Sequence, residues 1–192
     1  MLLHGHGIND MPKRTSERFS QTKEYELWQG VISRCYSDSF QRKRPSYIGC
    51  SASENFKSFS YFYDWCHRQV GFGNSGWQLD KDLLFKGNRV YSEDNCIFIP
   101  IEINNLFGKQ AKSKTNLPVG VIFHKGMGKF ASKVKCNSKD VYLGYFDNPE
   151  DAFNAYRDRK KIIITNMANK WKDQIDPRAY EAMINYDIDI ND

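Results

Sequence analysis

Side chains that could hold a metal ion against a phosphate are concentrated in residues 77–107, which read WQLDKDLLFKGNRVYSEDNCIFIPIEINNLF. Two carboxylates, Asp80 and Asp82, flank Lys81, and the amides of Asn95 and Asn104 follow. Carboxylate and amide oxygens are common ligands of hard divalent cations, and a lysine ammonium is a point charge that suits a phosphate. This stretch therefore has the composition of a phosphate-handling metal site, although the three charged residues could also form a salt-bridged turn.

Two short strands and a helix are expected to position these side chains. The stretch opens at Trp77 with a strand-like run that holds Asp80 and Asp82, and Gly87-Asn88 is a turn signal. The apolar run 96–100 predicts a second strand, and a short polar helix carrying Asn104 follows it. The expected order is strand, turn, strand and helix.

Before this stretch, apolar residues recur at helical spacing in two segments, 23–36 and 53–70, and Ser53 is the expected N-cap of the second. The intervening residues 37–47 are predicted to form a polar loop. A basic run in this loop could contact phosphate or could simply face solvent: Arg42, Lys43 and Arg44.

A second module is predicted over residues 117–172. Strands are expected near 119–123, 129–136 and 141–146, and Asn148 as N-cap with Pro149 behind it starts a helix. Alternation along the second strand places one set of residues on its outer face: Lys129, Ala131, Lys133 and Lys135. The simplest fold is a three-stranded antiparallel sheet packed on one helix.

Charge is distributed unevenly along the chain, although the net charge is only +5. Residues 1–108 contain 13 Lys and Arg against 12 Asp and Glu, whereas residues 109–172 contain 14 against 5 and residues 173–192 contain 1 against 6. We therefore expect a first module over 1–108, a linker over 109–116, a basic module over 117–172 and an acidic tail. A concentrated basic module points to a polyanion partner, foremost nucleic acid.

Composition excludes several other classes of protein. The 192 residues contain no apolar run of the roughly 18 residues that a membrane helix requires, and the first residues lack the basic region of a signal peptide. The five cysteines include no C-x-x-C pair, so neither zinc nor a disulfide framework is expected. These features predict a cytoplasmic protein that does not enter a membrane.

The second module resembles the plant ethylene-response-factor (Apetala-type) DNA-binding domain. The resemblance rests on Gly120-Val121, Gly128-Lys129-Phe130-Ala131, Leu143-Gly144-Tyr145-Phe146, Pro149-Glu150-Asp151-Ala152 and Ala155-Tyr156. It implies that the sheet enters the major groove of double-stranded DNA. The implied contacts are His124, Lys125, Lys129, Lys133, Lys135 and Lys139. Lysines at these positions would grip phosphate better than they discriminate bases.

The first module resembles the phage-type HNH homing endonucleases. The matching residues are Gly7-Ile8-Asn9-Asp10, Trp28, Arg34-Cys35-Tyr36, Tyr47-Ile48-Gly49-Cys50 and the motif LDKDLL…GNRVYSEDNCIFIP…IN. The resemblance implies a metal held by Asp80 and Asn104, with Asn95 as the other asparagine of the motif. Asp82 would then be the general base, and Lys81 would face the phosphate or the leaving oxygen. The family carries a histidine on the first strand, where this chain has Asp80-Lys81-Asp82.

The sequence thus predicts an α+β chain with N-terminal helices, an HNH-like ββα core and a sheet-on-helix module. The expected activity is cleavage of double-stranded DNA with Mg²⁺ or Mn²⁺. One alternative is a DNA-binding protein that keeps the nuclease scaffold without activity, as a phage regulator or an inhibitor of a host factor. Another is a protein–protein adaptor that uses its aromatic helices. Assembly into a homo-oligomer is left open.

Overall fold

The computed structural model describes residues 2–11, 15–17, 20–108, 116–136 and 139–190. The chain divides into two compact units, which are described separately. Unit 1 comprises residues 1–104 and 173–182, and unit 2 comprises residues 105–172 and 183–192. The mixture of helices and strands confirms the predicted α+β class. Within the described residues, no helix is both long and apolar enough to cross a membrane.

Unit 1 begins with short strands and helices: β1 (Leu2–Leu3), β2 (Gly7–Ile8), β3 (Ser16–Glu17), β4 (Ser20–Gln21), α1 (Lys23–Tyr36), α2 (Asp38–Lys43), the 3₁₀ helix η2 (Pro45–Tyr47), β5 (Ser51–Ala52), α3 (Glu54–Lys57) and α4 (Phe59–His67). It continues with β6 (Trp77–Asp80), β7 (Val90–Tyr91), β8 (Ile97–Pro100) and α5 (Ile101–Phe107). Helix α7 (Pro177–Ile184) follows much later in the chain, and the division between the units passes through α5 and α7.

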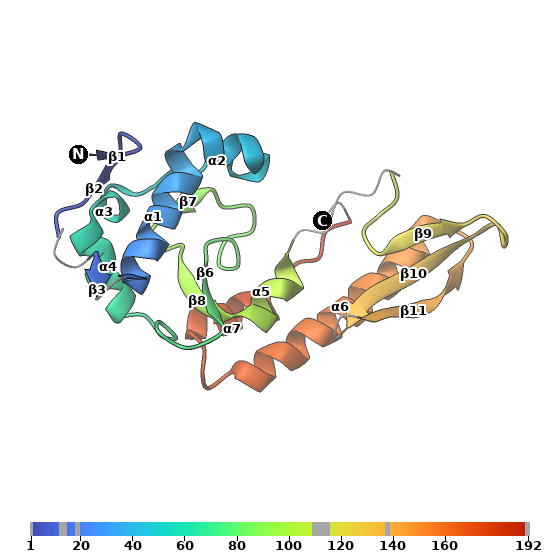
Figure 1. The fold of residues 1–192 in the computed structure, drawn as a ribbon. Helices are drawn as coiled ribbons and strands as arrows, with labels where there is room; N and C mark the ends of the chain where they lie inside the picture. Colours follow the sequence, from blue (N-terminus) through green and yellow to red (C-terminus); the bar gives the residue numbers. More distant parts are fainter. Residues whose placement is uncertain (1, 12–14, 18–19, 109–115, 137–138, 191–192) are drawn as a thin grey trace. The chain divides into compact units, whose positions relative to one another are not determined.

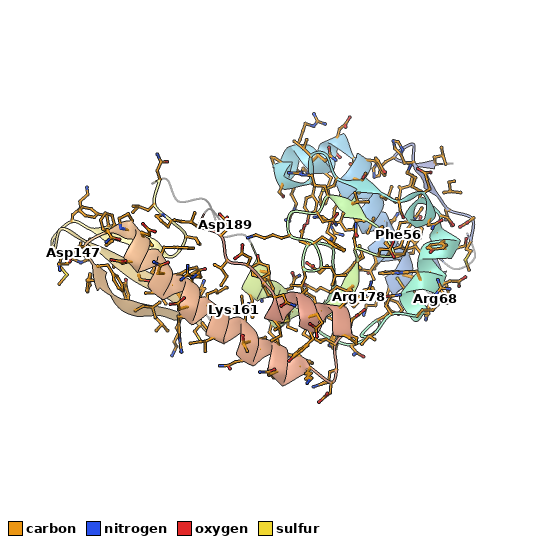
Figure 2. The ribbon with its side chains drawn as sticks, turned by 180° about the vertical axis from the view of Figure 1, so that it is seen from behind. Phe56, Arg68, Asp147, Lys161, Arg178 and Asp189 are labelled. Atoms are coloured by element: carbon orange, nitrogen blue, oxygen red, sulfur yellow. The ribbon has the colours of Figure 1, made fainter. Side chains whose placement is uncertain are left out.

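An aromatic cluster forms the core of unit 1. Trp28 from α1 and Phe56, Phe59 and Phe62 from α3 and α4 are fully buried (Figure 2 labels Phe56). The Trp28 indole Nε1 donates to the carbonyl oxygen of Phe56 at 3.0 Å, which satisfies its polar atom. Phe98 of β8 joins the same cluster, so the aromatic residues tie the helices to the second strand of the hairpin.

Two predicted elements of unit 1 differ from the structure. The predicted helix over 53–70 is broken at Ser58, which ends α3 and caps α4. Asp10 stabilises the break, because its carboxylate accepts hydrogen bonds from the Ser58 hydroxyl at 2.8 Å and from the Ser60 amide at 2.7 Å. The predicted loop over 37–47 is instead α2 followed by η2, and the Ser37 hydroxyl caps α2. A side-chain cap at Ser37 is a local signal for this helix.

The predicted strand-turn-strand-helix order is present in unit 1. Strands β6 and β8 pair antiparallel, with Asp80 opposite Ile97 and Gln78 opposite Ile99, and α5 follows β8 directly. Trp77 and Leu79 pack against the aromatic core. Because side chains alternate along a strand, Gln78 and Asp80 lie on the other face of the hairpin. The connection between the strands includes β7, which pairs parallel with β5.

Unit 2 is built on β9 (Val121–His124), β10 (Lys129–Cys136), β11 (Lys139–Phe146) and α6 (Pro149–Trp171). The strands form an antiparallel sheet in the order β11-β10-β9, and α6 covers one face of it (Figure 1). This arrangement confirms the predicted sheet on one helix. The Asn148 side chain accepts a hydrogen bond from the Asp151 amide at 2.8 Å, as expected for the N-cap. A register shift between Ser132 and Lys133 puts a bulge in the β10–β11 pair.

The segment predicted as an acidic tail, residues 173–192, is divided between the units. Its first part forms most of α7 in unit 1, where the Arg178 guanidinium donates to the Asp94 carbonyl oxygen at 3.3 Å. Its last part packs in unit 2: Ile188 is buried, and the Lys161 ammonium donates to the carbonyl oxygens of Ile184 and Tyr186. Of the predicted linker, residues 109–115 lie outside the described residues.

Close packing between Gly120 and α6 predicts a measurable stability difference between two glycine variants. Gly120 has φ +75°, and an added Cβ would lie 2.1 Å from Cδ2 of Tyr156. Gly120→Ala should therefore combine a conformational cost with overpacking and lower the free energy of unfolding by about 3 kcal/mol or more. Gly128 has φ +64° with no atom within 4 Å of the added Cβ, so Gly128→Ala should cost about 1–2 kcal/mol. Urea unfolding of the full chain distinguishes these expectations, and equal losses would contradict the close contact.

Candidate functional site

Asp80 ends β6 and shapes the turn that follows. Its Oδ1 accepts hydrogen bonds from the backbone amides of Asp82 at 2.9 Å and Leu83 at 2.7 Å. Burial raises the pKa of the Asp80 carboxyl, and the two amide hydrogen bonds partly offset that effect. The carboxylate thus organises the turn whether or not it also binds a metal ion.

Lys81 is buried, with 8% of its surface exposed. Its Nζ lies 2.6 Å from Oδ1 of Asp82 and 2.7 Å from the carbonyl oxygen of Asn88, and it approaches the ring of Tyr91. An ammonium group held by a carboxylate, a carbonyl and a ring does not extend into solvent. This geometry supports a structural role for Lys81, which fixes the connection between β6 and β8.

Asn88 is the residue of this region whose role sequence analysis missed. Its Nδ2 donates to the carbonyl oxygens of Lys81 and Val90, both at 2.8 Å, and its Oδ1 accepts from the Val90 amide at 3.0 Å. The Asn95 Nδ2 also donates to Asn88 Oδ1, at 3.2 Å. The sequence signal for Asn88 was its place after Gly87, which was interpreted only as a turn. Asn95 therefore stabilises the connection between β6 and β8 by its hydrogen bond to Asn88.

Asn104 lies on α5, and its Nδ2 donates to Oε1 of Gln78 at 2.8 Å. Gln78 and Asp80 are two residues apart on one face of β6, which separates their Cα atoms by roughly 6–7 Å. The Asn104 side chain therefore contacts Gln78, which lies two residues before Asp80 on β6. Asp82 is about half exposed and points to Lys81.

The β6–β8 hairpin offers few charged ligands to a divalent cation. The donors on the shared face are the Asp80 carboxylate and the amide oxygens of Gln78 and Asn104, and one oxygen of Asp80 already accepts two amide hydrogen bonds. Mg²⁺ is usually held through one or two carboxylates, with waters and substrate phosphates completing its shell. The residues thus fit a weak site that a bound phosphate would have to complete. In the described part of the chain, no group of three or more His, Cys, Asp or Glu side chains is placed to hold a metal ion.

The predicted basic run of unit 1 lies on and just after α2. Arg42, Lys43 and Arg44 are exposed, and Arg42 borders a shallow hollow together with Ile48. Arg89, at the end of the β6–β7 connection, donates to the carbonyl oxygen of Ile48 at 2.5 Å. The run and the connection therefore lie beside each other.

The outer face of the unit 2 sheet is rich in lysine and aromatic side chains. The pairs Lys129–His124, Ala131–Ile122, Ala131–Tyr145 and Lys133–Tyr142 define this face. The opposite face carries Val121, Ser132 and Val134, which are buried, and Gly120 at its edge abuts Tyr156 of α6. The predicted lysine-bearing face is thus the one turned away from α6.

Two tyrosines on this outer face were not predicted as site residues. Tyr142 is 60% exposed and Tyr145 is 45% exposed, and the Tyr145 ring makes an edge contact with His124 at 5.6 Å between centroids. The sequence predicts a strand near 141–146, but it does not show which face each tyrosine occupies. Exposed aromatic rings among positive charges are typical of surfaces that bind single-stranded nucleic acid.

The three remaining predicted contacts lie at different places in unit 2. Lys135 is exposed on the outer face, opposite Asp140. Lys125 lies in the β9–β10 turn. Lys139 pairs with Cys136, so alternation assigns it to the opposite face of the sheet.

Comparisons with protein-family models, curated proteins and solved structures find no match for this chain. The resemblances to HNH homing endonucleases and to ethylene-response-factor domains therefore rest on the motifs in the sequence.

Two Asp80 variants separate its structural role from its charge. Asn can still accept the two amide hydrogen bonds, so Asp80→Asn should be at least as stable as the wild type at pH 8, whereas Asp80→Ala should lose about 1–2 kcal/mol. The pKa of Asp80 is higher in the folded state than in the unfolded state. Its contribution to the free energy of unfolding is therefore fully present at pH values below the unfolded-state pKa, and it is lost as the pH rises through the folded-state pKa. The difference between wild type and Asp80→Asn should therefore shrink on acidification. Urea unfolding at several pH values measures it, and a strongly destabilised Asp80→Asn would contradict this account.

Proposed function

We propose that this chain is a double-stranded DNA-binding protein that contacts DNA through the outer face of its unit 2 sheet. The observation that carries the proposal is the clustering on that face of Lys129, Lys133 and Lys135 with the exposed rings of Tyr142 and Tyr145. Residues 109–172 have a net charge of +9, which complements the phosphate backbone.

The shape of unit 2 also suits a duplex. A major groove admits secondary-structure elements, including β-ribbons, and presents base edges to their side chains. The sheet is held rigidly by α6, so its outer side chains have fixed spacing. The basic run on α2 is a separate candidate phosphate contact of unit 1. These features favour DNA over a protein partner for the outer face.

Removing charge from the outer face should weaken DNA binding. Lys135→Ala should lower the affinity for a random-sequence duplex and reduce the slope of log Kd against log salt by about 1, because one phosphate contact is lost. Fluorescence anisotropy with a labelled duplex at several salt concentrations measures both quantities.

Arg159→Ala is the matched control. Arg159 is exposed on α6, which covers the opposite face, and the substitution removes the same charge. Binding by Arg159→Ala should resemble that of the wild type. Equal losses in the two variants would indicate a nonspecific charge effect, and a salt-independent or absent interaction in the wild type would remove DNA as the partner.

The second candidate function is metal-dependent cleavage of the bound DNA by unit 1. The observation that favours it is the β6–β8–α5 arrangement, in which Gln78 and Asp80 share one face of the hairpin and Asn104 of α5 contacts Gln78 on that face. Mg²⁺ or Mn²⁺ held there would stabilise the charge on a phosphate. Asp82 is the exposed carboxylate nearest the turn and remains the candidate base, since Lys81 is buried.

A nicking experiment tests this second candidate. Supercoiled plasmid incubated with protein and Mg²⁺ or Mn²⁺ should be nicked, and EDTA should stop the reaction. Asp80→Asn and Asn104→Ala should each lower the rate by about 100-fold or more, because even the loss of a supporting partner at a metal site costs about 10–100-fold. Asp64→Asn, at an exposed position on α4, should retain full activity. Retained DNA binding without nicking would leave the chain as a binding protein on a nuclease-like scaffold.

A further inference from the structure

A carboxylate also lies on the basic outer face of the unit 2 sheet. Asp140 is opposite Lys135 in the β10–β11 register, and its Oδ2 lies 2.7 Å from Nζ of Lys133. The side chains of Lys133 and Asp140 are 32% and 45% exposed, so the pair is accessible from outside the sheet. Its neighbours on the same face include Tyr142, which is paired with Lys133.

Stability alone does not explain this pair. An exposed ion pair contributes little to folding, typically about 0–1 kcal/mol. On a surface that binds phosphates, a carboxylate opposes binding, and Asp140 also occupies the ammonium of a lysine that could otherwise neutralise phosphate. The partner of Asp140, Lys133, lies next to the bulge, and bulges commonly re-aim the side chains next to them, which suits another role for the pair.

We propose that Lys133 and Asp140 together read a G·C base pair in the major groove; this inference rests on the proposed DNA-binding function. The Lys133 ammonium donates to O6 or N7 of guanine, and the Asp140 carboxylate accepts from the N4 amino group of cytosine. These are the donors and acceptors that a G·C pair presents at its major-groove edge.

The spacing of the two charged groups matches this edge. Within a G·C pair, guanine O6 and cytosine N4 are joined by a hydrogen bond of about 2.9 Å. The ammonium nitrogen and carboxylate oxygen of the protein pair are 2.7 Å apart, so each can face its complementary base atom at the same time. An A·T pair presents N6 of adenine as donor and O4 of thymine as acceptor, with the bulky thymine methyl beside it. The reversed T·A pair presents O4 and N6 in the same order as guanine O6 and cytosine N4, so discrimination against it would come from the thymine methyl.

A second ion pair on the same sheet provides the control. Lys129 Nζ lies 3.0 Å from Oδ1 of Asp147, just after the end of β11, where Figure 2 labels Asp147 at the end of unit 2. Asp147 is 86% exposed and follows the last strand residue, so it is not held within the sheet register. Asp140→Ala and Asp147→Ala thus remove the same charge, but only Asp140 belongs to the proposed reading pair.

Selection from a random duplex library by the full-length protein tests the proposal. The wild-type pool should show a G·C preference at one position, of about tenfold over A·T. Asp140→Ala should bind random duplex as tightly as the wild type or a few fold more tightly, and its pool should lose that preference. Lys133→Ala should also lose it, whereas Asp147→Ala should retain it. Urea unfolding of each variant verifies that the sheet remains folded.

Three outcomes would overturn the proposal, and they are distinguishable from failure of DNA binding itself. Retention of the G·C preference in Asp140→Ala would remove Asp140 from base reading. A wild-type pool without any preference would leave a DNA-binding protein whose sheet contacts only the backbone. Uniformly weaker binding by Asp140→Ala, with the preference intact, would assign the pair to maintaining the sheet. Absence of duplex binding by the wild type would instead refute the proposed function.

Discussion

A buried ammonium group holds together the part of unit 1 that resembles a nuclease centre. The Lys81 ammonium donates hydrogen bonds to the Asp82 carboxylate and to the carbonyl oxygen of Asn88. The side-chain amide of Asn88 in turn donates to the carbonyl oxygens of Lys81 and Val90. Burying an ammonium is costly unless such partners surround it. The position of the connection between β6 and β8 therefore depends on these contacts, which keep the Lys81 ammonium away from solvent. Lys81, whose type suggests a contact with phosphate, is thus held by structural contacts instead.

Unit 2 depends on a different constraint, the burial of one face of its sheet. Helix α6 covers Ser132, Val134 and Val121, and small residues such as Gly120 permit the close approach of Tyr156. Side-chain alternation then leaves lysines, tyrosines and Asp140 on the other face. One packing event thus both stabilises the unit and creates the surface proposed to bind DNA.

Much of this architecture could be predicted from local patterns. The N-caps Ser53 and Asn148 and the strand over 129–136 appear as expected. Prediction failed where a distant residue decided the outcome. The break at Ser58 depends on Asp10, which lies 48 residues earlier in the chain. Contacts between residues far apart in sequence carry no periodic signal.

The sequence by itself determined the types of side chain, their alternation along β10 and the concentration of positive charge in residues 109–172. Only the tertiary structure decided which of those groups are available. In the folded chain Lys81 is buried, and the Asp80 carboxylate accepts hydrogen bonds from the turn after β6. Asn104 contacts Gln78, and Lys133 forms an ion pair with Asp140. The physical reason is that charge and hydrogen-bonding capacity belong to a residue, whereas exposure and partners depend on every element packed around it.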